Sequence, residues 1–185
     1  MVMGRKIKVA FLEDGAMIGG AEINVLNLMQ RMDHNKFETL AICPFEGPFT
    51  EKVREIGGVV IIVPRLPLIS TSIFVRSRKI TNPLAIVWNF GSFIPSSVIL
   101  ARCLRQERID VLHTNSMFAH FYGALAARLV GARCIWHMQD IVNPVQAFGI
   151  LRKVINWCGG WLPHRIAVVS NAVGMMFTGN TAHKV

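Results

Sequence analysis

Charged residues are scarce in this chain, and acidic residues are scarcest in its later part. Only 17% of the 185 residues are charged and 52% are hydrophobic, a composition that excludes intrinsic disorder. Residues 1–58 carry 7 Lys and Arg against 8 Asp and Glu (−1), whereas residues 59–185 carry 13 against 3 (+10). Such a positive field attracts an anionic membrane, nucleic acid or a phosphate-bearing ligand, and composition does not choose among them.

Closely spaced cysteines are also lacking, which excludes the usual zinc and redox motifs. Each of the four cysteines lies in apolar sequence, and we expect buried, reduced thiols in a cytoplasmic protein at Cys43, Cys103, Cys134 and Cys158.

Several motifs of nucleotide binding and catalysis are absent. The chain has no G-x-G-x-x-G dinucleotide fingerprint, no Gly-Lys-Ser/Thr of a Walker loop and no Gly-x-Ser-x-Gly nucleophile elbow. His113, His120 and His137 lack the spacing and the carboxylate pattern of a short metal motif, so we expect no metal site.

No signal peptide is expected, because the basic start leads into a strand-like run without a small-residue cleavage site. One stretch, residues 84–104, meets the roughly 20-residue length of a transmembrane candidate. Polar residues, Gly91 and Pro95 lie near its middle. Three alternatives remain: a membrane span, contact with a membrane surface, and a buried pair of helices.

Strand-like and helix-length segments alternate along the chain, which predicts right-handed βαβ crossovers and a parallel sheet with helices on both faces. We expect one Rossmann-like α/β domain over residues 1–185, with residues 65–79 as a long exposed loop. The expected strands are 6–12, 37–42, 59–63, 109–113, 133–136 and 165–169, and the expected helices are 21–32, 50–57, 83–106, 117–130, 145–158 and 171–178.

In such sheets ligands bind beyond the carboxyl ends of the strands, which selects residues 13–20, 114–117, 137–140 and 170–171. The pair Gly19-Gly20 either turns the backbone into a helix or lets a phosphate approach the helix start. His137 either hydrogen-bonds a ligand or moves a proton, or it satisfies local backbone groups, and His113 has the same alternatives. Ser170 could simply cap the next helix.

Four pieces in order, Gly19-Gly-Ala-Glu22, residues 109–116, residues 124–137 and Arg165-Ile-Ala-Val-Val-Ser170, resemble the amino-terminal domain of the retaining glycosyltransferases of family 4, which have the GT-B fold. The resemblance covers nearly the whole chain. It implies two Rossmann-like domains facing across a cleft, with the first binding the acceptor and the second binding the nucleotide-sugar donor. It also implies transfer with retention of configuration, a nucleotide-sugar co-substrate and no obligatory metal or other cofactor.

The resemblance assigns roles to individual residues. The main chain at Gly19 and Gly20 would approach the donor diphosphate, and His137 would contact the donor sugar near the reacting centre, with Asp140 as the acidic residue that follows it. The remaining matches are an acceptor-facing loop, Thr114, Asn115 and Ser116, and a cleft loop at Ser170.

The resemblance also sets out what lies outside these residues. We expect a carboxyl-terminal donor-binding domain, in cis or in trans, and no transferase activity from this chain alone. Glu38 and Glu46 have the spacing of the family's glutamate pair, but about 26 Å of extended chain separates them, so the match is accidental.

The expected partners are a sugar or lipid-linked acceptor and an anionic membrane surface, and the expected location is the cytoplasm, peripheral to that membrane. The alternative from another class is a non-enzymatic basic module that binds nucleic acid or another phosphate-bearing ligand. It lacks a recognisable motif, and Tyr122 is the only tyrosine available for stacking, so nucleic acid is not expected as a partner.

Overall fold

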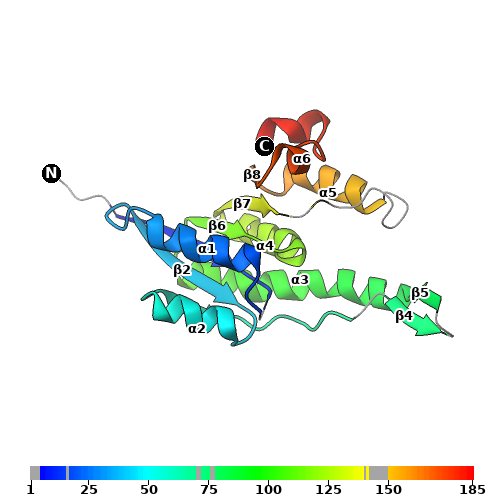
Figure 1. Ribbon diagram of the computed structural model, residues 1–185, viewed down its shortest axis with the longest axis horizontal. Helices are drawn as coiled ribbons and strands as arrows, with labels where there is room; N and C mark the ends of the chain where they lie inside the picture. Colours follow the sequence, from blue (N-terminus) through cyan, green and yellow to red (C-terminus); the bar gives the residue numbers. More distant parts are fainter. Residues whose placement is uncertain (1–4, 16, 70–71, 76–77, 140, 142–149) are drawn as a thin grey trace.

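The computed structural model describes residues 5–15, 17–69, 72–75, 78–139, 141 and 150–185. Six parallel strands form one sheet in the order β3-β2-β1-β6-β7-β8, and a second, two-stranded sheet pairs β4 with β5 in antiparallel register (Figure 1). The Rossmann-like α/β architecture expected from the sequence is confirmed.

The large sheet grows outward in both directions from its centre. The strands are β1 (Ile7–Leu12), β2 (Phe37–Cys43), β3 (Val59–Ile62), β6 (Val111–Thr114), β7 (Arg133–Met138) and β8 (Arg165–Val168). The helices are α1 (Gly20–Arg31), α2 (Pro48–Glu55), α3 (Pro83–Gln106), α4 (Met117–Val130), α5 (Ile150–Trp161), α6 (Asn171–Gly174) and the 3₁₀ helix η2 (Gly179–Lys184).

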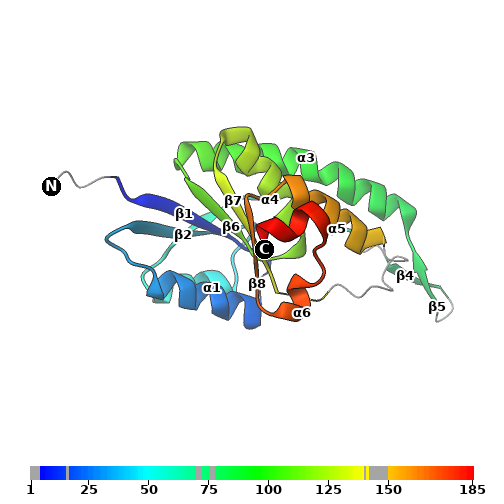
Figure 2. The same ribbon diagram turned by 90° about the horizontal axis from the view of Figure 1, so that it is seen from above.

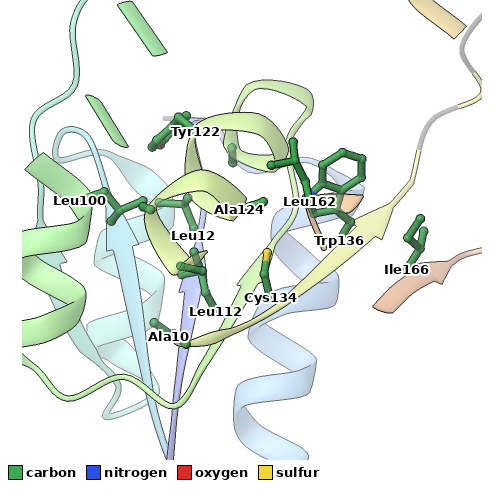
Figure 3. Close-up of a cluster of buried hydrophobic side chains, with 14 of the residues drawn as sticks. Ala10, Leu12, Leu100, Leu112, Tyr122, Ala124, Cys134, Trp136, Leu162 and Ile166 are labelled. Carbon is green, nitrogen blue, oxygen red and sulfur yellow. The ribbon is translucent and has the colours of Figure 1, made fainter. Parts of the chain in front are cut away.

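Helices cover both faces of the sheet (Figure 2). Alternate residues of β1 divide between two apolar clusters: Val9 and Phe11 pack with α1 and α2, whereas Ala10 and Leu12 pack with α3, α4 and α5. We call these the α1 face and the α4 face. Figure 3 shows the α4-face cluster around Leu12, Leu112, Cys134 and Trp136. A strand that is buried on both faces does not alternate apolar and polar residues, which is why the central strands are mostly apolar.

Local signals fix the ends of α4. Ser116 is its N-cap, and its hydroxyl accepts a hydrogen bond from the Ala119 N–H at 3.3 Å. Gly131 follows the last turn with φ 76°, in the left-handed region that only glycine adopts without cost.

Residues 65–79 were expected to be a long exposed loop; residues 65–69 have no helix or strand, but the expectation is wrong for the later part. The described residues there include β4 (Ser72–Val75) and the first residues of β5 (Arg78–Thr81), which form a hairpin at the far end of α3 in both views (Figures 1 and 2). The β-branched residues of these two strands lie among basic residues and close to prolines, which weakens their strand signal.

Residues 64–69, which we call the strap, connect β3 to this hairpin and lie along α3. Asn89 holds the strap at Ile69 by accepting from its N–H and donating to its carbonyl, both at 2.9 Å. Ser96 accepts from the Leu66 N–H at 3.3 Å, and the Trp88 indole donates to the Pro67 carbonyl at 3.0 Å. Asn89 and Ser96, two of the polar residues inside the apolar stretch 84–104, therefore fix the strap together with Trp88.

The stretch 84–104 does not form a buried pair of helices, because α3 runs unbroken from Pro83 to Gln106 with Pro95 inside it. Pro95 has no N–H to donate to the carbonyl of Gly91, four residues earlier in the helix. Gly91 and Pro95 are both solvent-exposed, so water can pair with this carbonyl. Among the described residues one stretch, Val87–Gln106, has the length and apolar character to cross a bilayer, and 47% of its most apolar window is buried inside the fold.

Two other helices and one cysteine differ from expectation. α5 extends to Trp161, beyond the expected end at Cys158, and residues 145–149 lie outside the described residues. α6 ends at Gly174 instead of reaching Thr178, and glycine at that position weakens the helical pattern. Cys103 is half-buried, whereas Cys43, Cys134 and Cys158 are buried as expected, and all four thiols are free.

Candidate active site at the carboxyl edge of the sheet

The strand order reverses between β1 and β6, which are neighbours in the sheet. The chain leaves β1 into α1 on one face and leaves β6 into α4 on the other, so the two connections diverge at the carboxyl edge. Ligands of open parallel sheets bind at such a reversal. The ends of β1, β6 and β7 are therefore the candidate site.

The glycine loop forms the start of α1. Gly19 is the N-cap and Gly20 the first helical residue. The Gly19 N–H donates to the Glu22 carboxylate at 2.7 Å, so a carboxylate already occupies part of the positive helix end. A Cβ on Gly20 would meet nothing within 4 Å, which leaves the main chain there open to a ligand. The cap is present, and contact of Gly19 and Gly20 with a donor diphosphate stays a prediction.

His137 and Asn115 are brought together on the α1 face. The His137 Nδ1 lies 3.1 Å from the Asn115 Oδ1, and Gln139 Nε2 approaches the same oxygen at 3.5 Å. Asn24 on α1 in turn donates to Gln139 Oε1 at 3.2 Å. His137 is thus held by the side chain of Asn115, which directly follows the neighbouring strand β6. One alternative from the sequence was that His137 satisfies local backbone groups, and this side-chain contact differs from it.

The two strand-end histidines are neutral near pH 7. Burial, together with the nearby His137, lowers the pKa of His113 to about 3, and burial also lowers the pKa of His137. The two rings make an edge contact with centroids 5.1 Å apart. Because an amide oxygen only accepts, the proton of neutral His137 resides on Nδ1 in this geometry, and Nε2 carries a lone pair that accepts a hydrogen bond.

A second polar group lies on the α4 face. Asp14 Oδ1 accepts from Arg65 Nε at 2.8 Å and from the Tyr122 hydroxyl at 2.9 Å. Burial, and then the charge of Asp14, raises the pKa of Tyr122 well above its ordinary value, so the phenol stays a donor. This group attaches the strap to the end of β1.

The structure separates Thr114 from Asn115. Thr114 is fully buried on the α4 face, where its hydroxyl lies 2.7 Å from His120 Nδ1 and 3.3 Å from the Ile135 carbonyl. Burial lowers the pKa of His120 to about 3, so this pair is a neutral core contact. Of the three residues expected to face an acceptor, Asn115 alone has its side chain among the polar groups of the α1 face.

The two serines act locally as caps. The Ser116 hydroxyl caps α4, and the Ser170 hydroxyl accepts from the Val173 N–H at 3.3 Å at the start of α6. The capping alternative for Ser170 is confirmed, and the acceptor and cleft roles of these residues stay predictions. Asp140 lies outside the described residues.

Glu13 is a site residue that sequence reasoning did not select, although it lies in the loop chosen for inspection. It directly follows β1 and is 1% exposed. Burial, and then the charge of Glu22, raises the pKa of its carboxyl to about 7. Asn24 and Gln139 were also missed, because a lone amide in a helix or loop carries no sequence signal of its own.

Within the part of the chain that the structure describes, His, Cys, Asp and Glu side chains do not gather in a group of three or more that could hold a metal ion. The three histidines divide between faces: His113 and His137 lie on the α1 face and His120 on the α4 face.

The parallel sheet, its helical covering and a polar edge at the strand reversal define a Rossmann-like domain of the GT-B type. The family model of Glycosyltransferase Family 4 matches residues 18–179. The chain belongs to glycosyltransferase family 4. This membership does not favour the alternative of a nucleic-acid-binding module.

Individual relatives agree in fold and are longer. The chain is 24% identical over 132 residues to the UDP-Gal:alpha-D-GlcNAc-diphosphoundecaprenol alpha-1,3-galactosyltransferase of Escherichia coli, covering 71% of this chain and 29% of that protein. The HepE protein of Anabaena in complex with UDP and glucose superposes with a TM-score of 0.69 at 17% identity, over 96% of this chain and 43% of HepE. Acinetobacter baumannii MurG superposes with a TM-score of 0.56 at 15% identity, over 90% of this chain and 42% of MurG. This chain therefore spans less than half the length of each.

Proposed function

We propose that this chain is the amino-terminal, acceptor-binding half of a retaining glycosyltransferase that transfers a sugar from a nucleotide-sugar to a glycan, lipid-linked or small-molecule acceptor. The observation that carries the proposal is the His137–Asn115 pair at the strand reversal of a family 4 chain. HepE is described in complex with UDP-glucose, and the galactosyltransferase acts on a diphosphoundecaprenol-linked sugar, which supports a nucleotide-sugar donor and a lipid-linked acceptor.

The geometry supports a division of roles within this proposal. The main chain at Gly20 is open and would face the donor diphosphate, and the His137 Nε2 lone pair would accept a hydrogen bond from a sugar hydroxyl near the reacting carbon. In the transfer, the bond from the anomeric carbon to the diphosphate oxygen breaks and a bond to the acceptor oxygen forms on the same face. The acceptor proton leaves with the diphosphate. No cofactor is consumed.

In this proposal a second Rossmann-like domain binds the nucleotide, which is supported by relatives more than twice as long as this chain. We expect no turnover of a nucleotide-sugar by these 185 residues alone. When the chain is joined to its donor-binding domain, we expect transfer from a UDP-sugar to a polyprenyl-diphosphate-linked sugar, measured as radiolabel moving into the lipid phase. A complete enzyme that hydrolyses or transfers nothing from a panel of UDP-sugars would contradict the proposal, as would turnover by the isolated chain.

The protein is cytoplasmic and binds the surface of an anionic membrane through α3 and the hairpin. Leu84 is 79% exposed, Val87 70% and Ile94 65%, all on α3. Figures 1 and 2 place the hairpin, whose second strand begins with Arg78-Lys79, at the end of α3 that carries Leu84 and Val87. Apolar side chains that enter the headgroup region and basic residues that meet anionic lipids reinforce each other.

Replacing Leu84 and Val87 together with glutamine is expected to weaken vesicle binding at least ~10-fold, because each apolar side chain contributes about 1.5–3 kcal/mol when buried. The measurement is co-sedimentation with phosphatidylcholine vesicles containing phosphatidylglycerol, at low and at high salt. The control is Leu129→Gln on α4, which is also exposed and should bind like wild type. No binding of wild type at low salt would indicate a soluble acceptor.

A further inference from the structure

Three buried polar atoms at the carboxyl edge lack hydrogen-bond partners among the residues that the structure describes. They are Glu13 Oε2, His113 Nδ1 and Asn115 Nδ2. Glu13 is 1% exposed and Asn115 5% exposed. A buried polar group without a partner costs roughly 1–3 kcal/mol, so several in one place point to a partner that the described residues do not supply.

These three atoms belong to one face of two adjacent strands. Leu12 pairs in register with Thr114, and the Asn115 N–H donates to the Leu12 carbonyl at 3.3 Å, so Glu13 and Asn115 follow at the same level. Alternation along the strands places both on the α1 face, together with His113, whose ring lies 5.1 Å from that of Phe11. Two further unpartnered atoms, Asp14 Oδ2 and Trp136 Nε1, belong to residues on the α4 face.

The chemistry of this group suits neutral hydroxyls. A carboxyl oxygen beside an amide N–H₂ offers an acceptor and a donor, and adjacent sugar hydroxyls each donate and accept. A phosphate does not fit at these atoms, because the Glu13 carboxyl has no proton to donate when ionised and would repel an anion, whereas a hydroxyl donates to it. The donor diphosphate therefore binds elsewhere along the carboxyl edge of the sheet, and the unpartnered atoms of Glu13, His113 and Asn115 pair with a different ligand group.

We propose that Glu13 and Asn115 form a subsite that binds hydroxyl groups of the acceptor sugar, with Glu13 setting which hydroxyl is accepted. This subsite rests on the proposed glycosyltransferase function and adds a residue to it. Glu13 orients the sugar and takes no part in bond breaking.

The surroundings of Glu13 make the subsite sensitive to pH. Its carboxyl faces Glu22 from α1, the buried Cys43 thiol from β2 and Asp14 from its own loop, and its Oε1 accepts from the Asp14 N–H at 3.0 Å. Burial and the Glu22 charge raise the Glu13 pKa from 4.5 to about 7. A hydroxyl bonded to Glu13 favours the ionised form, because a charged acceptor makes the stronger bond.

The test uses the 185-residue chain and one probe, the methyl α-glycoside of N-acetylglucosamine, with NMR detection of the Glu13 side-chain carboxyl carbon. We expect a titration midpoint near 7 without glycoside, and a lower midpoint at saturation. Affinity should therefore rise about 5- to 10-fold as pH rises through 7, the gain of a charged over a neutral hydrogen bond. Glu13→Gln should keep its fold, bind more weakly than wild type at pH 8 and show no pH dependence.

Controls separate binding from folding. Glu38→Gln, an exposed carboxylate on β2, should behave like wild type. Because the pKa of Glu13 is higher in the folded than in the unfolded chain, the free energy of unfolding of wild type should fall as pH rises from 4.5 toward 7. Glu13→Gln should not show this fall. The difference checks that the Glu13 carboxyl is buried.

A Glu13 carboxyl that does not respond to 100 mM glycoside, or a Glu13→Gln variant that binds like wild type at pH 8, would overturn the subsite. Transfer by the complete enzyme with an unresponsive Glu13 would overturn the subsite alone. A responsive Glu13 in an enzyme that transfers no sugar would instead overturn the proposed function and leave a sugar-binding edge.

Discussion

Alanine in place of His137 is expected to lower kcat/KM about 100- to 1000-fold in the complete two-domain enzyme, the usual loss on removing a preorganised polar group at a reacting centre. The loss should appear mainly in kcat, because Asn115 fixes the imidazole before substrate arrives, and its Nε2 bond matters most when charge develops on the sugar. Since burial lowers the pKa of His137, the ring is already neutral at pH 7, and protonation of His137 should not limit activity between pH 7 and 8.

The control for this variant is His34→Ala. His34 is exposed in the turn between α1 and β2, at the opposite edge of the sheet, and its loss should leave kcat/KM within about 2-fold of wild type. Steady-state kinetics with both substrates varied would separate kcat from KM. A loss below about 3-fold for His137→Ala would show that the imidazole is a structural member of the edge and no part of the catalytic centre.

Alanine in place of Trp136 is expected to lower the free energy of unfolding by about 3–5 kcal/mol, the transfer and cavity cost of deleting a large buried aromatic. Trp136 is 0% exposed and lies in the α4-face cluster (Figure 3), and its ring stacks on His120 at 5.3 Å and meets Phe121 edge-on at 5.6 Å. This is a large share of the 5–15 kcal/mol that stabilises a typical domain.

Urea unfolding followed by circular dichroism would measure this loss, with Trp157→Ala as the matched control. Trp157 on α5 is 68% exposed and contacts Trp161, so its removal should change stability by about 0.5 kcal/mol or less. Equal losses for the two variants would mean that β7 is not packed as the structure shows it.

Much of the fold could be predicted from the sequence because burial on both faces leaves a strong local mark. All six strands of the large sheet were expected, since each is a short β-branched run bounded by charge, proline or glycine. The hairpin of β4 and β5 was missed because its strands lie among basic residues and close to prolines, a composition that predicts a loop. The helix over 83–106 was predicted with the bounds that α3 has, and it continues through Pro95 because contacts with α4 and the strap outweigh the local cost of proline.

The candidate site could be predicted only in outline. The rule that ligands bind beyond the strand ends selected the loops that contain His137, Asn115 and Glu13. Which side chains meet is decided by register and by the alternation of faces: Thr114 and Asn115 are adjacent in sequence and lie on opposite sides of the sheet. The raised pKa of Glu13 depends on Glu22 and on burial beneath α1, neither of which is visible in the residue itself.

The strand order affects the chain while it is still on the ribosome. β1 pairs along one edge with β2, which follows within the next 31 residues, but its other edge waits for β6, because Val9 pairs with Val111. At about 5–20 residues per second, those roughly 100 residues leave one edge of β1 unpaired for about 5–20 s. An unpaired apolar strand edge is a template for aggregation. The nascent chain therefore exposes this edge to other chains during the interval, and a slowly translated stretch before β6 would lengthen the exposure.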